Sequence, residues 1–387
     1  MSIQNFFSSM LPHRMKRQVR EMLVSTILLN LALAMVTIFE PIYLYQLGYS
    51  LQQIIFFYLL VYVPYLLIMP MGAKFARAKG YEWGIFVGSL FFALFYVSLF
   101  LVQAYPWMFY LAPLVFAVQK MFYWPAYHAG FAKFSDDSEE GREISAFNIG
   151  SSLMYIIGPA LAGFIIYDWG YGALFTMASI IFLLSNIPTL VTKEKFEYKN
   201  FSYWQAYKDL FSKENRRSLF AYLGFGEELI VMVIWPIFIS IIIVNVFDLG
   251  LIVALATLIT VLITLYVGKL SDSKNKRSVL DLGSAFYSIA WFIRIFVVNQ
   301  MGVFFVDTMS RLAKNIIVIP LMTITYERAK KRSVMETAIF FEMSLVVGKL
   351  IAILAIYAAL FFITDEIFAM KLTFILAGSM SLLYMLL

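Results

Sequence analysis

The stretch VGKLSDSKNKRSVL, residues 267–280, decides the fold. A long apolar segment ends at Leu270, polar or charged residues occupy 271–277, and the chain then becomes apolar again. Charged side chains are costly inside a bilayer, so a short polar cluster of this kind is expected where a chain leaves the membrane and turns back into it. The stretch therefore predicts a short loop between two membrane-spanning helices.

The composition of the whole chain supports a membrane protein. Of its 387 residues 62% are hydrophobic and 14% are charged, whereas soluble domains are about 45–50% apolar and about 25% charged. The chain has no cysteine, which excludes disulfides, thiol chemistry and cysteine-based metal sites. We predict neither a metal site nor a cofactor.

Helical spans are predicted from the length of the apolar segments. A helix needs about 20 apolar residues to cross the hydrocarbon core, and none of the segments alternates in polarity as the strands of a membrane barrel do. The apolar run that follows the basic residues 1–22 is too long for a signal peptide. Twelve spans are expected, at about 23–47, 51–73, 83–103, 107–132, 143–167, 171–191, 218–246, 249–270, 279–299, 301–325, 334–362 and 366–387.

Basic residues outside these spans lie on one side of the predicted membrane. The N-terminal segment and every second loop hold 24 of the 30 Lys and Arg residues, and the alternate loops hold none. By the positive-inside rule both termini are predicted to be cytoplasmic, in a multi-pass protein of the cytoplasmic membrane. The net charge of +6 is thus assigned to a membrane surface and its lipids, and no nucleic-acid partner is predicted.

One long connection, residues 192–217, divides the chain into two sets of six spans, 23–191 and 218–387. Its aromatic and basic residues favour a helix that lies on the cytoplasmic surface. A solvated linker without such a helix is the alternative. Residues 1–22 are expected to form a cytoplasmic N-terminal segment.

The opening stretch also contains the pattern G-x-L-x-D-x-x-x-K-R. It resembles the signature loop of the major facilitator superfamily of transporters, where the loop joins helices 2 and 3 and often also helices 8 and 9. The first-half counterpart, GAKFARAKGYEW from Gly72, keeps the glycine and basic residues but has no aspartate. The two loops are about half the chain apart, as a duplicated six-helix unit requires. The residues of the 8–9 loop that carry the pattern are Gly268, Leu270, Asp272, Lys276 and Arg277.

Helix 5 carries a second resemblance, to a motif of the exporters in that family. Its sequence GSSLMYIIGPALAGF contains Gly158 and Pro159, but Ala162 and Met154 stand where those exporters usually have glycine. Close helix packing alone would also explain small residues here. The resemblance as a whole implies an all-α fold of two pseudo-symmetric six-helix bundles around a central cavity, with transport by alternating access.

Many charges lie inside the predicted spans, where they are functional suspects. The family resemblance places most of them on cavity-lining helices, whereas Arg294 and Lys371 fall on helices 9 and 12 and are expected at the periphery. Mutual neutralisation is the alternative, and Asp307–Arg311 is the best candidate pair because the two residues are four apart on one helix. The candidate substrate and ion site comprises Glu40, Lys120, Glu227, Glu228, Asp307, Arg311, Lys314, Glu342 and Lys349.

Three roles are predicted within this set. The adjacent carboxylates Glu227 and Glu228 oppose each other's ionisation, so proton coupling is predicted there, with Glu40 as a second candidate. Arg311 and Lys314 are expected to contact an anionic part of the substrate, in a basic cluster with Lys120 and Lys349.

The predicted function is proton-coupled efflux of a small anionic or amphiphilic solute by a monomeric secondary transporter. Alternatives are proton-coupled import of an organic anion, sodium as the coupling ion, and a receptor or scaffold that keeps the fold without transport. An enzyme is not expected, since the chain has two histidines, His13 and His128, and no catalytic motif.

The 8–9 loop is predicted to act as a cytoplasmic latch. Asp272 would pair with the positive N-terminal end of helix 5 or with Arg142. Lys276 and Arg277 would hold anionic lipid or the acidic residues between 136 and 140. These contacts would favour the state that is open to the outside.

Overall fold

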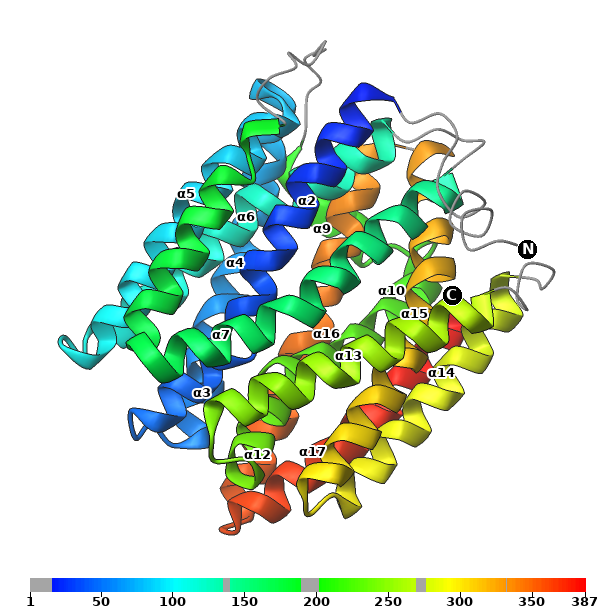
Figure 1. Ribbon diagram of the computed structural model, residues 1–387. Coiled ribbons are helices and arrows are strands. Elements are labelled where there is room, and N and C mark those ends of the chain that lie inside the picture. The colour runs from blue at the N-terminus through cyan, green and yellow to red at the C-terminus, as the bar shows by residue number, and fades with distance from the viewer. Residues whose placement is uncertain (1–15, 135–139, 189–201, 269–275, 332) are drawn as a thin grey trace, which may run out of the picture.

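The computed structural model describes residues 16–134, 140–188, 202–268, 276–331 and 333–387, and the regular structure in these ranges is helical (Figure 1). The first half contains α2 (Arg17–Val36), α3 (Phe39–Gln46), α4 (Leu51–Lys79), α5 (Tyr81–Phe100), α6 (Met108–Phe134) and α7 (Glu140–Leu184). The second half contains α10 (Arg216–Leu223), α11 (Glu227–Leu229), α12 (Trp235–Ile242), α13 (Val246–Gly268), α14 (Lys276–Ile293), α15 (Gln300–Lys331), α16 (Val334–Phe362) and α17 (Glu366–Ser381). Each predicted span corresponds to one of these helices, to consecutive helices or, in α7, to part of a helix.

Among the described residues, nine helical ranges are long and apolar enough to cross a membrane. Two further helices, α6 with 27 residues and α15 with 32, also have the length of a span. One of the nine ranges, Ile149–Leu184, covers most of two predicted spans, 143–167 and 171–191. They are joined at Gly170, whose φ of 79° and ψ of 177° interrupt the helical geometry of α7. Glycine reaches a positive φ without a steric penalty, which allows the chain to turn back there.

Breaks in two of the spans lie next to charged side chains. The first span is divided between α2 and α3, just before Pro41, which has no N–H to bond the carbonyl four residues earlier. Glu40 lies at this break. The first span of the second half contains a 3-10 turn at Gly224–Gly226 and a π-helical segment at Ile230–Ile234, and Glu227 and Glu228 lie between them. π-Helical segments often occur at functional sites.

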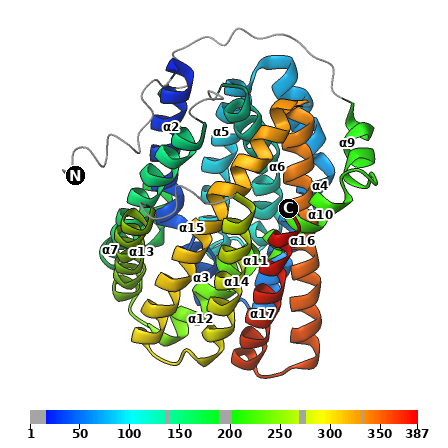
Figure 2. The same cartoon turned by 90° about the vertical axis from the view of Figure 1, so that its right-hand side faces the viewer.

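The two halves pack along pairs of helices, α7 with α13 and α4 with α16 (Figures 1 and 2). Glycines make the first contact close, since a Cβ at Gly250 would lie 2.3 Å from the Pro159 carbonyl oxygen. At the end where α2 begins, which is the predicted cytoplasmic end, the rings of Phe131 and Tyr326 are 4.9 Å apart. At the opposite end the side chain of Gln52 donates to the Leu360 carbonyl, 3.0 Å away. Contacts between side chains or backbone groups of the two halves are therefore present at both ends.

The connection between the halves contains a short helix, α9 (Tyr203–Leu210), beside α4 and α16 (Figure 2). The hydroxyls of Tyr203 and Tyr207 donate to the Leu67 carbonyl at 2.8 and 3.0 Å, and Tyr207 also reaches the Leu66 carbonyl at 3.0 Å. Pro70 has no N–H for the Leu66 carbonyl, so the tyrosine supplies the missing donor. This connection thus contains a helix over 203–210 that packs on the first half.

Candidate transport site between the halves

Glu227 lies at the centre of a fully paired cluster in the second half. Its carboxylate is 0% exposed and accepts from the Lys314 ammonium at 2.5 Å and from the hydroxyls of Tyr287 at 2.7 Å and Tyr384 at 3.1 Å. The partners come from α15, α14 and the C-terminal turn. A buried carboxylate requires such partners, because an unpaired buried charge is strongly unfavourable.

Glu228 links the same cluster to α16. Its carboxylate oxygens lie 3.0 Å from the Lys349 ammonium and 3.5 Å from that of Lys314. Close backbone packing brings these helices together, since a Cβ at Gly226 would lie 2.4 Å from the Gly348 carbonyl oxygen. The Glu228 side chain keeps 28% exposure, so this part of the cluster remains accessible.

Asp307 forms a second ion-paired group. Arg311 contacts it at 2.7 Å, which is the helical pair predicted from spacing, and the Trp235 indole donates to it at 3.1 Å. The expectation that Arg294 lies at the periphery is wrong. Its guanidinium is 2% exposed, lies 3.5 Å from Asp307 and stacks on the rings of Trp235 and Trp291, at 4.2 and 3.9 Å.

The reason for this error is that helix position was inferred from the family arrangement alone. The sequence signal that would have corrected it is Trp291, three residues before Arg294 on the same helix face, because indole rings stabilise a desolvated guanidinium. Lys371, the other charge expected at the periphery, is half-buried on α17.

Glu40 and Lys120 in the first half have a different environment. Glu40 accepts from the hydroxyls of Tyr58 at 2.7 Å and Tyr96 at 3.0 Å, and Lys120 lies 4.2 Å from the Phe116 ring centroid. Among the residues that the structure describes, these two are the buried charged side chains without an ion-pair partner. The predicted site residues of the first half are thus held by aromatic side chains, and those of the second half, apart from Glu342, by opposite charges.

Glu342 connects the halves near the predicted cytoplasmic end. Its carboxylate accepts from the Tyr65 hydroxyl of α4 at 2.8 Å and lies 3.0 Å from Nε2 of His128 on α6. Nδ1 of His128 in turn lies 2.9 Å from the Tyr326 hydroxyl on α15. The sequence singles out His128 only in the search for catalytic motifs. Its position in an otherwise apolar and aromatic stretch is the signal from which a polar contact with another helix could have been predicted.

Only some of the residues of the predicted latch lie within the part of the chain that the structure describes. Asp272 lies outside the described residues, and so do the side chain of Arg142 and the acidic residues 136–139. Lys276 differs from the expectation, since its ammonium contacts Glu327 of α15 at 2.6 Å, within its own half. The first turn of α14 brings it beside the end of α15. Gly158 packs α7 on α2, where an added Cβ would lie 2.5 Å from the Ala34 Cβ.

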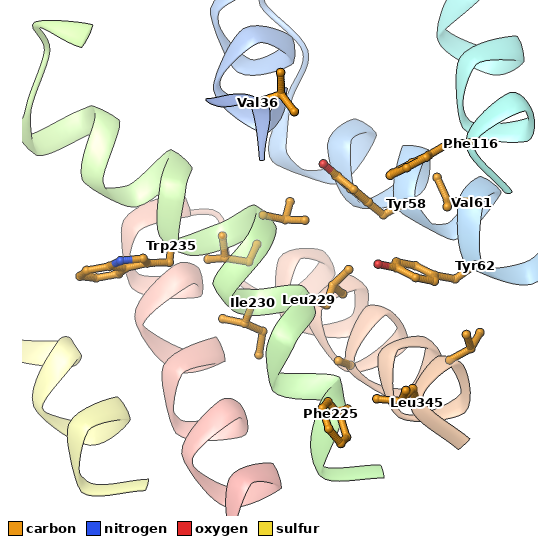
Figure 3. Close-up of a cluster of buried hydrophobic side chains, with 14 of the residues drawn as sticks. Val36, Tyr58, Val61, Tyr62, Phe116, Phe225, Leu229, Ile230, Trp235 and Leu345 are labelled. Carbon is orange, nitrogen blue, oxygen red and sulfur yellow. The ribbon is translucent and has the colours of Figure 1, made fainter. Parts of the chain in front are cut away.

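Candidate residues of both halves come together around Tyr62. Tyr62 of α4 directs its hydroxyl toward the helix of the second half that carries Leu229 (Figure 3). Its ring lies 5.8 Å from the Lys120 ammonium and 5.4 Å from that of Lys349. The arrangement can hold ions and protons in place. Over the described residues no group of three or more His, Asp or Glu side chains could hold a metal ion.

Comparisons with known proteins agree with this architecture. No curated protein matches the chain significantly. The crystal structure of a variant of the E. coli fucose:proton symporter FucP is similar in fold, with a TM-score of 0.67 at 12% identity over 95% of this chain and 97% of the symporter. The family model of the Major Facilitator Superfamily matches residues 22–334. The chain therefore belongs to the major facilitator superfamily of membrane transporters.

Proposed function

We propose that this protein is a proton-coupled secondary transporter that works by alternating access, and that Glu40 carries the coupled proton. The observation that carries the proposal is the environment of Glu40, which is 5% exposed and bonded to two tyrosine hydroxyls. A tyrosine hydroxyl can donate or accept a hydrogen bond. Tyr58 and Tyr96 can therefore serve both the ionised and the protonated carboxyl group, so a proton can be gained and lost without rebuilding the site.

The adjacent acids of the second half, which the sequence favoured for this role, have the opposite environment. An ammonium partner stabilises the ionised form of a carboxylate. Lys314 contacts Glu227 at 2.5 Å and Lys349 contacts Glu228 at 3.0 Å. We therefore assign the proton to Glu40 and a fixed, ion-paired role to these two acids.

Alternating access is supported by contacts between the halves at both ends. His128–Glu342 joins them toward the predicted cytoplasmic end and Gln52–Leu360 at the other. Contacts of this kind form only when their own end is closed, so opening either end breaks one set and keeps the other. The basic loops support an orientation with both termini in the cytoplasm.

The direction of transport receives no support from the helix-5 residues. Gly158 and Pro159 pack α7 against α2 and α13, and such packing serves a transporter in either direction. The export that the motif favours thus rests on the resemblance alone.

The test begins with a screen of metabolites and drugs for compounds that raise the Tm of the detergent-solubilised protein. Uptake of a labelled hit is then measured in proteoliposomes with and without an imposed pH gradient. Glu40→Gln is expected to lose gradient-driven accumulation and to keep exchange of the solute across the membrane. Glu336→Gln, at an exposed acid of α16, serves as the matched control. Full gradient-driven accumulation by Glu40→Gln would refute the proposal.

A further inference from the structure

Two lysines from different halves converge on one aromatic ring. The ammonium groups of Lys120 on α6 and Lys349 on α16 lie 5.8 and 5.4 Å from the centroid of Tyr62. They are therefore no farther apart than the sum of these distances, and their positive charges repel each other. Figure 3 shows Tyr62 reaching from α4 toward the second half. Two positive charges, one from each half, therefore lie near each other at this ring.

Only one lysine of this pair, Lys349, has an ion-pair partner among the described residues. Glu228 contacts Lys349 at 3.0 Å but also Lys314 at 3.5 Å, so one carboxylate serves two ammonium groups. Lys120 has no ion-pair partner among the described residues and keeps 8% exposure. A lysine ammonium has three N–H donors, and contact with the Phe116 ring at 4.2 Å leaves them without an anionic acceptor.

We propose that Lys120 and Lys349 bind the anionic group of the transported solute, a carboxylate or a phosphate, across the ring of Tyr62. The solute's anion supplies the acceptor that Lys120 lacks and neutralises charge from both halves. Tyr62 and Phe116 offer aromatic surface to the part of the solute next to that group. This inference rests on the proposed transport function and names its substrate class.

Binding of the anion is linked to the proton on Glu40. Ionised Glu40 attracts Lys120 and so competes with the solute for its charge, whereas protonated Glu40 leaves Lys120 to the solute. Proton and anion thus favour each other's binding, which makes the transporter a symporter that moves both in the same direction. The titratable or charged groups that face Glu40 and Lys120 from other helices are Tyr58 and Tyr62 of α4, Tyr96 of α5, Glu228 of α11, and Glu342 and Lys349 of α16.

The test compares charged and uncharged probes of similar shape. The Tm of the full-length protein in detergent is measured with benzoate against benzamide, octanoate against octanamide, and glucose 6-phosphate against glucose. The charged member of at least one pair is expected to raise the Tm more than its uncharged partner, and the pair that responds distinguishes a carboxylate from a phosphate. Equal effects within all three pairs would overturn the proposal.

Variants then locate the binding of the responding probe. Lys120→Gln and Lys349→Gln are expected to weaken it by about tenfold or more, as the loss of a charge-assisted hydrogen bond does. Lys120→Arg keeps the charge and retains binding even if the glutamine variants fold poorly. Lys371→Gln, on α17, is the matched control. Unchanged affinity in Lys120→Gln would exclude the site.

Failure of the anion site differs from failure of proton coupling. If Lys120→Gln takes up the charged probe as well as wild type under a pH gradient and Glu40→Gln does not, the anion site is refuted and the proposed function remains. If Glu40→Gln keeps gradient-driven uptake while probe binding requires Lys120, proton coupling through Glu40 is refuted and the anion site remains. Binding of the charged probe to wild type should also weaken as pH rises, and an affinity independent of pH would refute the linkage.

Discussion

Apart from the contact of His128 with Glu342, the two halves of this transporter hold their buried charges by different means. In the second half Glu227, Glu228 and Asp307 each contact at least one cationic side chain within 3.0 Å. In the first half Glu40 contacts tyrosines and Lys120 contacts aromatic rings. Ion pairing fixes the charge state of a side chain, whereas an aromatic environment leaves it free to change. The ion-paired side chains of the second half are therefore suited to a fixed charge state, and Glu40 is suited to gain and lose a proton.

Removing a cation from the second half is expected to have the largest effect. Lys314→Met leaves Glu227, which is 0% exposed, without its ammonium partner, and breaking a buried pair in this way costs about 3–5 kcal/mol. Thermal unfolding in detergent measures the loss, with Lys371→Met as the control. A Tm close to that of wild type would contradict the ion-paired description of this half.

Breaking the polar contact between the halves is expected to have an intermediate effect. His128→Phe removes the contacts with Glu342 and Tyr326, a loss of about 1–3 kcal/mol for buried hydrogen-bonded groups. The closed state at the predicted cytoplasmic end loses that free energy, so opening should increase by roughly 5- to 150-fold.

Cysteine labelling measures this opening directly, because the chain contains no cysteine. Ala329→Cys, at a position that is 2% exposed in the cluster at that end, should react faster with a maleimide in the His128→Phe background. Lys331→Cys, at an exposed position, gives the reference rate. Equal acceleration at both positions would indicate unfolding instead of opening.

Neutralising the acid of the first half is expected to change stability little. Glu40→Gln keeps the size of the side chain and an oxygen that accepts from Tyr58 or Tyr96, so the loss should stay below about 1 kcal/mol. Glu227→Gln, the matched change in the second half, should lose more, because it leaves Lys314 uncompensated. Comparison of the two Tm values tests the difference between the halves. A lower Tm for Glu40→Gln than for Glu227→Gln would contradict it.

A comparably small effect is expected at the connecting helix. Tyr207→Phe removes the hydroxyl that bonds the Leu66 and Leu67 carbonyls and should lower stability by about 0.5–1.5 kcal/mol. Trp204→Phe changes a residue that is 71% exposed and controls for the general effect of substitution in α9. A Tm equally low in both variants would argue against the hydrogen bonds as the cause.

Much of the architecture follows from the sequence, because span length and the sidedness of basic residues are local properties. The pair Asp307–Arg311 was also predictable, since four residues on a helix bring two side chains together. The ion pairs and hydrogen bonds between helices could not be predicted. The spacing of Lys314 and Glu227 along the chain does not determine how their two helices are rotated toward each other.

The contact of His128 with Glu342 shows the same limit more strongly, since the two residues belong to different halves. Arg294 shows a second limit. Its burial depends on the indole rings of Trp235 and Trp291, one of which comes from another helix. Sequence thus identified the charged residues, whereas their assignment to fixed or changeable roles required the packing.

The short helix α9 has a consequence for how the protein could be assembled. It precedes the second half in the chain, yet its tyrosines bond carbonyls of α4 in the first half, and it also lies beside α16. A docking element for one bundle is thus carried by the polypeptide of the other. Two separately expressed fragments, divided between residues 189 and 201, should therefore find each other in one membrane and restore transport.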